Sequence, residues 1–527
     1  MYSCSQLRAP LCLVLFAIVG ASLALSGEQL IDAQATLPVL DYVDSPEFLE
    51  SLRTKAVPVL LRNTPAQTRW SALKSWVPVG TNPSTFYLSK VSERTVGVKR
   101  NSSPKFPIGC CPLVPMTQKE FWIALTGLPE GQYMYFNADL SVLDPVLRSD
   151  LHPQFFSVSR ASSSTSDKTI TNVWMGSKGS TAALHHDPFD NFFVQIYGRK
   201  KFTLFSPDLH HSFYVYPKTH PASRQAQVNI DEPDERRFPK LSGIIANNID
   251  DDDHSSSSAN SDEKGSLAHG NRGVTVNEKT VRGALESGIE IVVKPGDVLY
   301  LPPFWFHQVE ALDTAISVNT WFDSPDVEIM DAAWSEPLPF SADWSDEGFA
   351  LGLKLMIHEL VNKVLGHPKD TRQQAEALTR SFIQDLVDTR FKPLYGEDPD
   401  KESDLLKGIK TTDDPHLRVH LREQTELDAS TFISKEALPE LTSICAIPTS
   451  ELLEGDPEFE KALKNGVRAI ARHFMAVEKR SGFQIMHLED FVEDLIGQAV
   501  GDKSVYHFLA SCFLQDDDLK HENSVRF

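Results

Sequence analysis

The chain has 527 residues, of which 41% are hydrophobic, so it is long enough for one domain and a second module with ordinary cores. Its 72 acidic and 51 basic residues give a formal net charge of -21, which argues against nucleic-acid backbone binding as a main activity. The six cysteines do not form the Cys/His clusters of zinc-finger reader modules, which excludes that class.

The N-terminus predicts a targeting segment. An apolar run covers residues 11–25, and Ala21, Ala24 and Ser26 are small residues that suit signal peptidase. We therefore expect residues 1–26 to be a signal peptide, with the rest of the chain in the secretory pathway, either in the endoplasmic reticulum lumen or secreted. The run is close to the length of a short membrane span, so an uncleaved anchor is the alternative, and only that alternative implies a membrane partner.

Two weaker features agree with that location. Asn101-Ser102-Ser103 is an N-glycosylation sequon, which would make the protein a glycoprotein, although an unused surface tripeptide is the alternative. Beyond the signal segment, Cys110, Cys111, Cys445 and Cys512 are even in number and permit disulfides. A bond between the adjacent Cys110 and Cys111 would be strained, so we expect them to pair with Cys445 or Cys512.

The segment Ala183-Leu184-His185-His186-Asp187-Pro188 contains the first candidate site. On a β-strand, residues i and i+2 point to the same face. His185 and Asp187 would therefore project together, while His186 points away. A third ligand could then come from a neighbouring strand.

Lys200 is the second candidate. It follows the strand pattern of residues 192–196 and a turn at Gly198, and it precedes the alternating run of residues 201–205. A buried lysine needs an anion, and a dicarboxylate cosubstrate would supply one if Lys200 points into a barrel. The alternative is that Lys200 and Arg199 are solvated residues of a hairpin turn.

A polar segment follows. Residues 247–273 include the runs Asp250–Asp253 and Ser255–Ser258 and hardly any apolar side chain. Such a segment cannot bury enough surface to offset its ordering entropy, so we predict a disordered insertion. A cation-binding or phosphorylated segment is the alternative.

His307 is the candidate for the third ligand. Residues 291–293 and 298–301 are β-rich runs, and the Pro-Gly-Asp turn between them is expected to return the chain antiparallel. Two imidazoles and one carboxylate on one face leave coordination positions open. That arrangement is typical of non-haem Fe(II) oxygenases, whereas structural zinc sites are closed by four ligands.

From about residue 340 the apolar period changes from two residues to helical spacing. Such stripes are more often core than cofactor sites. They run over residues 349–364, 378–391, 459–477 and 488–495. Residues 340–527 are therefore expected to be an α-helical module, which could pack on the preceding domain, form a homodimer or position a substrate.

The ordered features resemble the Jumonji C family of cupin-like oxygenases, in particular its small hydroxylase branch. Residues 57–63 resemble the opening strand, 133–137 a strand with a cosubstrate-binding tyrosine, and 317–322 the closing strand, with the His-x-Asp block and Trp305-Phe306-His307 between. The resemblance implies an α+β fold. A double-stranded β-helix (cupin or jelly-roll barrel) with flanking helices would occupy residues 38–335.

The resemblance also implies the chemistry. His185, Asp187 and His307 would bind Fe(II), and Lys200 would pair with the distal carboxylate of the cosubstrate 2-oxoglutarate. With O2, such a dioxygenase couples the decarboxylation of 2-oxoglutarate to hydroxylation of a substrate carbon. The expected partner is a protein or peptide substrate, and the expected target is a protein side chain.

Three more pocket residues follow from the resemblance, namely Asn191, Tyr135 and Asn319. The family often has a hydroxyl residue three positions before the first ligand, where this chain has Ala182, with Thr181 one place further back. The second partner of the cosubstrate carboxylate is therefore Thr181, Tyr135 or a water.

Three other functions stay open. Hydroxylation of an N-methyl group would remove the methyl, but histone demethylation is disfavoured by the charge and by the compartment. A cupin-type metal or carbohydrate-binding protein would more often supply His-x-His with a further Glu and His. A non-catalytic scaffold would usually have lost a ligand, whereas all three are present here.

Overall fold

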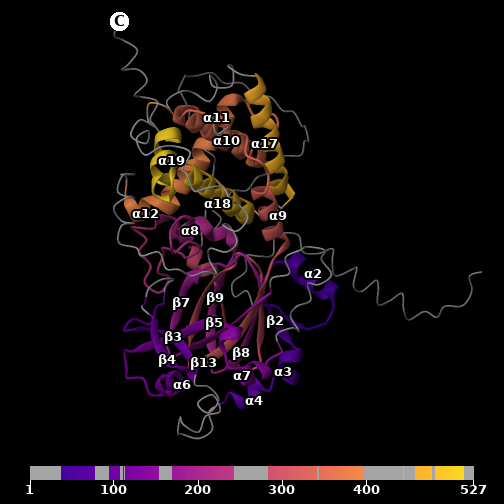
Figure 1. Cartoon of the computed structure of the whole chain (residues 1–527), viewed down its shortest axis with the longest axis vertical. Helices are drawn as coiled ribbons and strands as arrows, with labels where there is room; N and C mark the ends of the chain where they lie inside the picture. Colours follow the sequence, from indigo (N-terminus) through magenta and orange to yellow (C-terminus); the bar gives the residue numbers. More distant parts are fainter. Residues whose placement is uncertain are drawn as a thin grey trace, which may run out of the picture.

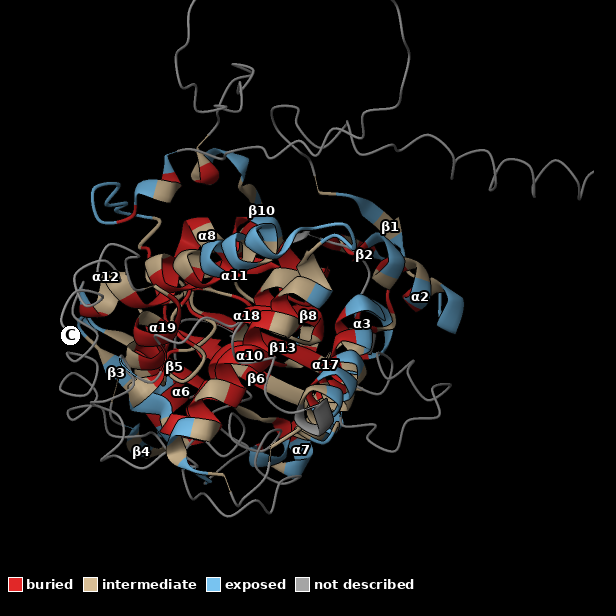
Figure 2. Cartoon of the chain, turned by 90° about the horizontal axis from the view of Figure 1, so that it is seen from above, coloured by how far each residue is buried: buried red, intermediate tan, exposed pale blue. Residues whose placement is uncertain are grey.

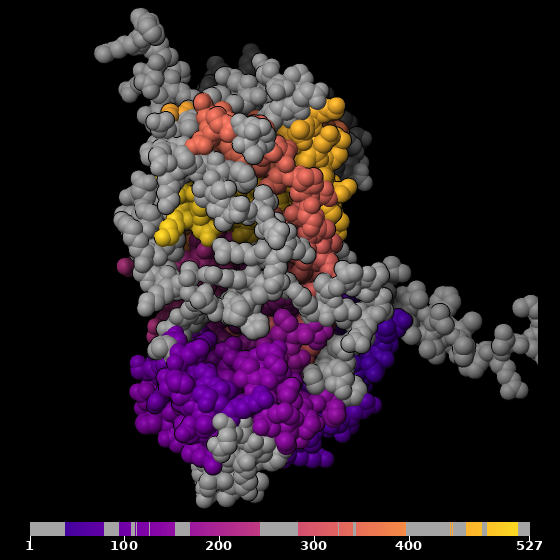
Figure 3. All heavy atoms as spheres, in the orientation of Figure 1, coloured from indigo at the N-terminus to yellow at the C-terminus, as the bar shows by residue number. Residues whose placement is uncertain are grey.

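The computed structural model describes residues 37–77, 94–106, 111, 113–152, 169–242, 283–340, 344–396, 443, 445, 457–476 and 481–514. They form a barrel lobe of strands and a helical lobe stacked on one end of it (Figure 1). The space-filling view shows the same two lobes, with the orange and yellow C-terminal helices above the indigo and magenta barrel lobe (Figure 3). The predicted signal peptide and acidic insertion lie outside the described residues.

The barrel lobe contains two sheets. Within the described residues, the larger sheet has nine strands in the order β1 (Val39–Asp41), β2 (Val59–Arg62), β11 (Val298–Leu301), β8 (Asp190–Tyr197), β13 (Ala315–Phe322), β6 (Ile170–Gly176), β5 (Tyr133–Asp139), β3 (Thr95–Asn101) and β4 (Leu113–Thr117). The smaller sheet has the order β10 (Ile289–Val293), β9 (Lys200–Phe205), β12 (Phe306–Ala311) and β7 (Thr181–His185). Apart from the parallel pair β1 and β2, neighbouring strands are antiparallel. The α+β jelly-roll prediction is confirmed.

One expected strand pairing is wrong. Both β-rich runs around the Pro-Gly-Asp turn are strands, but β10 pairs with β9 in the smaller sheet, and β11 pairs with β2 and β8 in the larger sheet. The turn thus carries the chain from one sheet to the other. All four residues of β11 are buried, which suits a central strand covered on both faces rather than one arm of a hairpin.

Alternation along the strands separates two apolar cores. Phe193, Phe202, Leu204 and Leu299 fill the space between the sheets. The outer face of the larger sheet is covered by helices, namely α2 (Pro46–Lys55), α3 (Pro65–Arg69), α4 (Ala72–Ser75), α6 (Gln118–Thr126) and α7 (Pro145–Ser149). Inward-facing positions of these strands are therefore positions inside the barrel.

The helical lobe confirms the helical stripes. Its helices are α9 (Pro325–Trp334), α10 (Asp346–Leu365), α11 (Arg372–Leu386), the π-helical turn Val387–Phe391, α12 (Lys392–Tyr395), α17 (Pro457–Ala476), α18 (Ser481–Val500) and α19 (Val505–Phe513). Their apolar faces form one core, to which α9 also contributes Met330 and Ala333. Seen from above, buried residues gather around α10 and α18, whereas α2 and α3 at the periphery are largely exposed (Figure 2).

A disulfide joins Cys445 to Cys512 within the helical lobe. The expected pairing of either residue with Cys110 or Cys111 is therefore wrong. The reason is topological: Cys512 lies on α19 in the core of the helical lobe, whereas Cys111 precedes β4 at the far edge of the larger sheet. Among the helices described, none is both long and apolar enough to cross a bilayer.

The two lobes meet through apolar side chains that both of them contribute. The short helix α8 (His210–Phe213) and the loop before β12 lie on the barrel side, and the first turns of α18 lie against them. Phe304 contacts Phe483 with ring centroids 4.4 Å apart. This junction is next to the candidate metal residues, because Phe304 precedes His307 by only three positions.

Candidate metal centre and cosubstrate pocket

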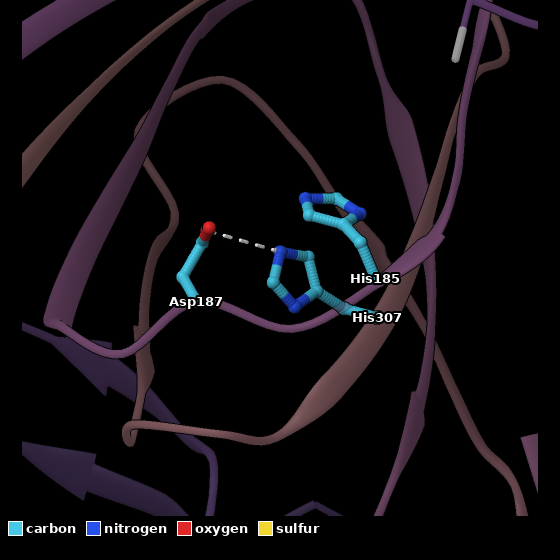
Figure 4. A group of neighbouring side chains, drawn as sticks. All are labelled: His185, Asp187 and His307. Carbon is cyan, nitrogen blue, oxygen red and sulfur yellow. Dashed lines mark ion pairs between the residues drawn. The ribbon is translucent and has the colours of Figure 1, made fainter. Parts of the chain in front are cut away.

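Three predicted ligands come together inside the barrel. His185 is the last residue of β7, and its register partner on β12 is His307. The two imidazole centroids are 4.2 Å apart, and Oδ2 of Asp187 lies 3.7 Å from Nε2 of His307. One ligand atom from each residue lies within 4.8 Å of the other two. Figure 4 shows the three side chains pointing toward one another.

Backbone carbonyls orient both imidazoles. Nδ1 of His185 lies 2.7 Å from the carbonyl oxygen of Ala183, and Nδ1 of His307 lies 2.9 Å from that of Trp305. Each ring therefore places its proton on Nδ1 and presents the Nε2 lone pair to the centre, as a metal ligand must. Burial lowers the pKa of His307 to about 4, with His185 adding to the effect, so His307 is neutral at physiological pH.

Asp187 is held beyond the end of its strand. We expected both members of the His-x-Asp pair on one strand, but β7 ends at His185. The backbone N–H of Phe304 donates to the carbonyl oxygen of Asp187 at 2.7 Å, and that of His186 donates to Arg224 at 3.0 Å. Phe304 and Arg224 have positive φ angles of 64° and 71°, a conformation that side chains adopt rarely and that recurs at functional sites.

His186 points away from the centre, as predicted. Its ring stacks on Phe304 at 5.4 Å and meets the edge of Phe306 at 5.1 Å. It is therefore a packing residue between the lobes rather than a fourth ligand.

Arg224 is a contact that the sequence did not reveal. Its Nη1 lies 3.3 Å from Oδ1 of Asp187, opposite the oxygen that faces His307. A guanidinium on one carboxylate oxygen fixes the direction of the other. No pattern marks this arginine, because its loop reaches the site only through an isolated bridge between His185 and Gln225.

Lys200 is buried on the inner face of the barrel. It alternates with Phe202 and Leu204 on β9, and Leu204 is the register partner of His307 on β12. Its Nζ donates to Oγ of Ser317 at 2.8 Å and lies 5.4 Å from the Phe193 ring. Within the described residues, no carboxylate reaches this ammonium, and burial lowers its pKa to about 7. The solvated-turn alternative for Lys200 is therefore wrong, whereas Arg199 does lie at the surface, paired with Asp313.

Ser317 is the hydroxyl that sequence reasoning missed. It was visible only as part of the closing strand, two positions before Asn319 and so on the same face of β13. Thr181, the hydroxyl considered instead, donates to the carbonyl oxygen of Gly179 at 3.1 Å. The structure thus gives Lys200 a serine partner, and Thr181 is engaged in a local turn.

The predicted asparagines form a short chain of hydrogen bonds. Nε1 of Trp174 donates to Oδ1 of Asn319 at 2.6 Å, and Nδ2 of Asn319 donates to Oδ1 of Asn191 at 3.1 Å. Asn191 alternates with the interior residue Phe193 on β8, so it also points inward. Each acceptor is satisfied, and Nδ2 of Asn191 is the donor at the end of the chain.

Tyr135 is also inside the barrel. Its ring stacks on Phe106 at 5.4 Å and lies 6.2 Å from Trp174, the indole that donates to Asn319. Burial raises the pKa of the Tyr135 hydroxyl well above its usual range, so it stays protonated. Four of the five predicted cosubstrate residues therefore line one interior, whereas Thr181 lies opposite Glu310 on the other face of the smaller sheet and bonds to its own backbone.

The fold and the side chains define a class of protein. Two imidazoles and a carboxylate supply three convergent ligand atoms, which fits an Fe(II) ion that keeps exchangeable positions. A buried ammonium that no carboxylate of the described residues reaches fits the distal end of a dicarboxylate. The residues present are those of a cupin-like barrel that binds a metal ion together with an anionic cosubstrate.

Comparison with known proteins also indicates a cupin-like barrel. Residues 124–249 and 275–328 match the family model described as a cupin-like domain. Over 296 residues the chain is 25% identical to lysine-specific demethylase 8 of Xenopus tropicalis, covering 55% of this chain and 54% of that protein. Over 299 residues it is 21% identical to Jumonji C domain-containing protein 5 of Drosophila melanogaster, covering 56% and 61%. Over 183 residues it is 26% identical to lysine-specific demethylase JMJ31 of Arabidopsis thaliana, covering 35% and 25%.

The barrel is therefore a cupin-like domain similar to those of Jumonji C proteins, and these similarities support a place in the superfamily of Fe(II)- and 2-oxoglutarate-dependent oxygenases. The chain spans about half the length of the first of these relatives. The matched residues contain the whole candidate site from Tyr135 to Asn319.

Proposed function

We propose that this protein is a 2-oxoglutarate-dependent Fe(II) dioxygenase that hydroxylates a protein side chain in the secretory pathway. The observation that carries the proposal is the pair of complementary sites in one barrel. His185, Asp187 and His307 present three ligand atoms within 4.8 Å of one another, and Lys200 is a buried ammonium whose described polar partner is Ser317.

In this proposal His185, Asp187 and His307 would hold Fe(II), and Lys200 with Ser317 would hold the distal carboxylate of 2-oxoglutarate. The bound metal and cosubstrate would supply the oxidation of a C–H bond by O2. The Trp174–Asn319–Asn191 chain orients the Asn191 amide donor toward the interior. Arg224 keeps the Asp187 carboxylate in one orientation, and the surrounding aromatic residues exclude water.

Demethylation is the second candidate, because two of the relatives named above are called lysine-specific demethylases. The same oxidation of an N-methyl carbon would give an unstable product that loses formaldehyde. The net charge of -21 weighs against a substrate bound to nucleic acid. A methylated lysine on another protein is compatible with the same residues.

The secretory location rests on three features. The N-terminal apolar run is the first, and the disulfide between Cys445 and Cys512 is the second, because disulfides persist in oxidising compartments. The sequon is the third. Nδ2 of Asn101 donates to the carbonyl oxygen of Lys105 at 3.0 Å, which uses one of the two amide N–H groups and leaves the other for a glycan.

Two measurements test the proposal. Anaerobic titration of the purified chain with Fe(II), with and without 2-oxoglutarate, should give a weak visible charge-transfer band only when both are present. In air, the same mixture should form succinate when a substrate is added. Absence of both the band and succinate would leave a metal-binding or scaffold protein instead.

The substrate requires a separate experiment. Mass spectrometry of secretory-pathway proteins from cells with and without the gene should find a residue that gains one oxygen only when the gene is present. A methyl group lost under the same comparison would favour the demethylase alternative.

A further inference from the structure

A second group of potential metal ligands lies at the junction of the two lobes. Within the described residues, the only two groups whose donor atoms fall within 4.8 Å of one another are the barrel triad and His210, His211 and Glu489. The two histidines begin α8 on the barrel lobe, and Glu489 lies on α18 of the helical lobe. They are separated by 278 residues in sequence between His211 and Glu489, so only the folded chain brings them together.

The donor atoms converge on a small volume. Nε2 of His211 lies 2.8 Å from Oε1 of Glu489, and Nε2 of His210 lies 3.8 Å from Oε2 of the same carboxylate. The two imidazole centroids are 3.9 Å apart. Ligand atoms about 2.0–2.1 Å from a tetrahedral zinc ion lie roughly 3.3 Å apart, so the first distance would open and the second would close by about half an ångström, which side-chain rotation allows.

His210 supplies an independent sign that a ligand is missing. Its side chain is 5% exposed, and its Nε2 is buried without a hydrogen-bond partner. Its Nδ1 lies 3.2 Å from the carbonyl oxygen of Pro207, which places the proton on Nδ1 and the lone pair on Nε2. A buried acceptor without a donor is costly, and a metal ion would satisfy it.

The surroundings of Glu489 suit a ligand as well. Nη2 of Arg390 donates to Oε2 of Glu489 at 2.7 Å, which fixes the plane of the carboxylate and directs Oε1 toward His211. Arg390 also contacts Asp490 and Glu493 at 2.7 Å each. The guanidinium is thus shared among three carboxylates and is not committed to Glu489 alone.

We infer that His210, His211 and Glu489 form a second divalent-cation site, of the zinc type, that joins the helical lobe to the barrel. Zinc is the ion chosen for the test, because two imidazoles and one carboxylate with a water can complete its tetrahedral shell. The His211 side chain is 26% exposed, so an ion can reach the site from solvent. The site is distinct from the barrel triad and uses none of its residues.

The test counts zinc on the full-length chain after the barrel site has been removed. In a His185→Ala, Asp187→Ala background, equilibrium dialysis against Zn²⁺ should leave about one zinc per chain by mass spectrometry of the metal. Adding His211→Gln should reduce the bound zinc to nearly none, because the amide can still donate to Glu489 but is a poor metal ligand. His367→Gln, in the loop after α10, is the matched control and should leave the count unchanged.

Cobalt supplies a second readout. Co²⁺ in the double-variant background should show the visible absorption of a tetrahedral site, and His211→Gln should abolish it. Retention of zinc and of the cobalt spectrum by His211→Gln would overturn the inference, as would a background chain that binds no zinc at all. In the latter case the three residues are a hydrogen-bonded ion-pair cluster only. If His211→Gln fails to fold, judged by circular dichroism, His210→Gln makes the same comparison.

Discussion

The barrel interior and the junction between the lobes both bury positive charge, but they compensate it in opposite ways. In the barrel, Lys200 has Ser317 as its hydrogen-bond partner and no carboxylate within the described residues. At the junction, Arg390 lies 2.7 Å from each of Glu489, Asp490 and Glu493. Lys200 gains a counterion only when an anionic ligand binds, whereas Arg390 gains its counterions when the two lobes pack together.

This difference separates a binding site from a structural contact. A buried cation without a counterion destabilises the folded chain. Binding of an anionic ligand supplies the counterion and offsets that free energy. A buried cation surrounded by carboxylates contributes to one arrangement of the chain and needs no anionic ligand. The predictions below test that division, beginning with the residues expected to matter most.

The largest effect is expected at the metal centre. Asp187→Ala removes one of three ligands and should lower kcat by at least about 10³-fold, equivalent to about 4 kcal/mol of activation free energy. Because the barrel core does not depend on this carboxylate, the melting temperature of the metal-free chain should change little. Succinate formation measures kcat, and thermal unfolding measures the melting temperature. Full turnover by the variant would show that the triad does not take part in the reaction.

The next effect concerns stability alone. Arg390→Met leaves Glu489 and Glu493 buried without their guanidinium and should destabilise the protein by about 3–5 kcal/mol. Chemical denaturation of the full chain measures this. Arg199→Met is the matched control, because Arg199 and Asp313 form a surface pair, and it should leave the denaturation midpoint unchanged. Equal midpoints for both variants would contradict the structural role of the junction cluster.

Lys200→Met tests the opposite case. The free chain should be as stable as the parent or more stable, because an uncompensated buried ammonium is replaced by an apolar side chain of similar size. Binding of 2-oxoglutarate should weaken by about 10- to 100-fold, the loss expected for a charge-assisted contact worth about 1.5–3 kcal/mol. Titration of the charge-transfer band gives the affinity. Unchanged affinity would mean that the cosubstrate carboxylate lies elsewhere.

Part of the barrel site could be predicted from the sequence, because its residues lie on or next to strands whose side chains alternate between two faces. Two-residue alternation predicted that His185 and Asp187 project together. It left Lys200 either inside a barrel or in a solvated turn, and the family resemblance supplied its role. Ser317 could not be found in this way, because a serine within a strand carries no pattern until β13 is paired with β8 and β6. The position of Asp187 beyond the end of β7 depends equally on contacts with a distant loop.

The junction cluster could not be predicted from the sequence for a different reason. Arg390 and Glu489 are 99 residues apart on helices whose charged residues have the pattern of ordinary solvated faces. Their burial depends on tertiary packing, which brings α18 into contact with His211 of α8 and with Arg390 of the turn at Val387–Phe391. The disulfide partner of Cys445 was mispredicted for the same reason.

The pH dependence of cosubstrate affinity tests whether the Lys200 ammonium binds the cosubstrate carboxylate. Burial lowers the pKa of the free Lys200 ammonium to about 7, and a bound carboxylate requires the protonated form. As pH rises above about 7, the free chain must take up a proton to bind, so affinity should fall by up to about tenfold per pH unit, equal to about 1.4 kcal/mol. Lys200→Met should bind weakly with no such slope. A parent affinity that stays constant from about pH 6 to about pH 9 would exclude Lys200 as the titrating partner.

The smallest effect is expected at Asp190, a buried charge in the barrel lobe that is already compensated. Its carboxylate accepts from the Tyr300 hydroxyl at 2.6 Å and pairs with Nε of Arg53 at 2.8 Å. Tyr300→Phe removes one of these contacts but leaves the ion pair, so it should cost about 1 kcal/mol of unfolding free energy and leave cosubstrate affinity unchanged. Denaturation and the charge-transfer titration measure the two quantities on one preparation. A loss of affinity here would show that compensated charges in this barrel also act on the ligand, and the division between binding and structural ions would then depend on the lobe rather than on the counterion.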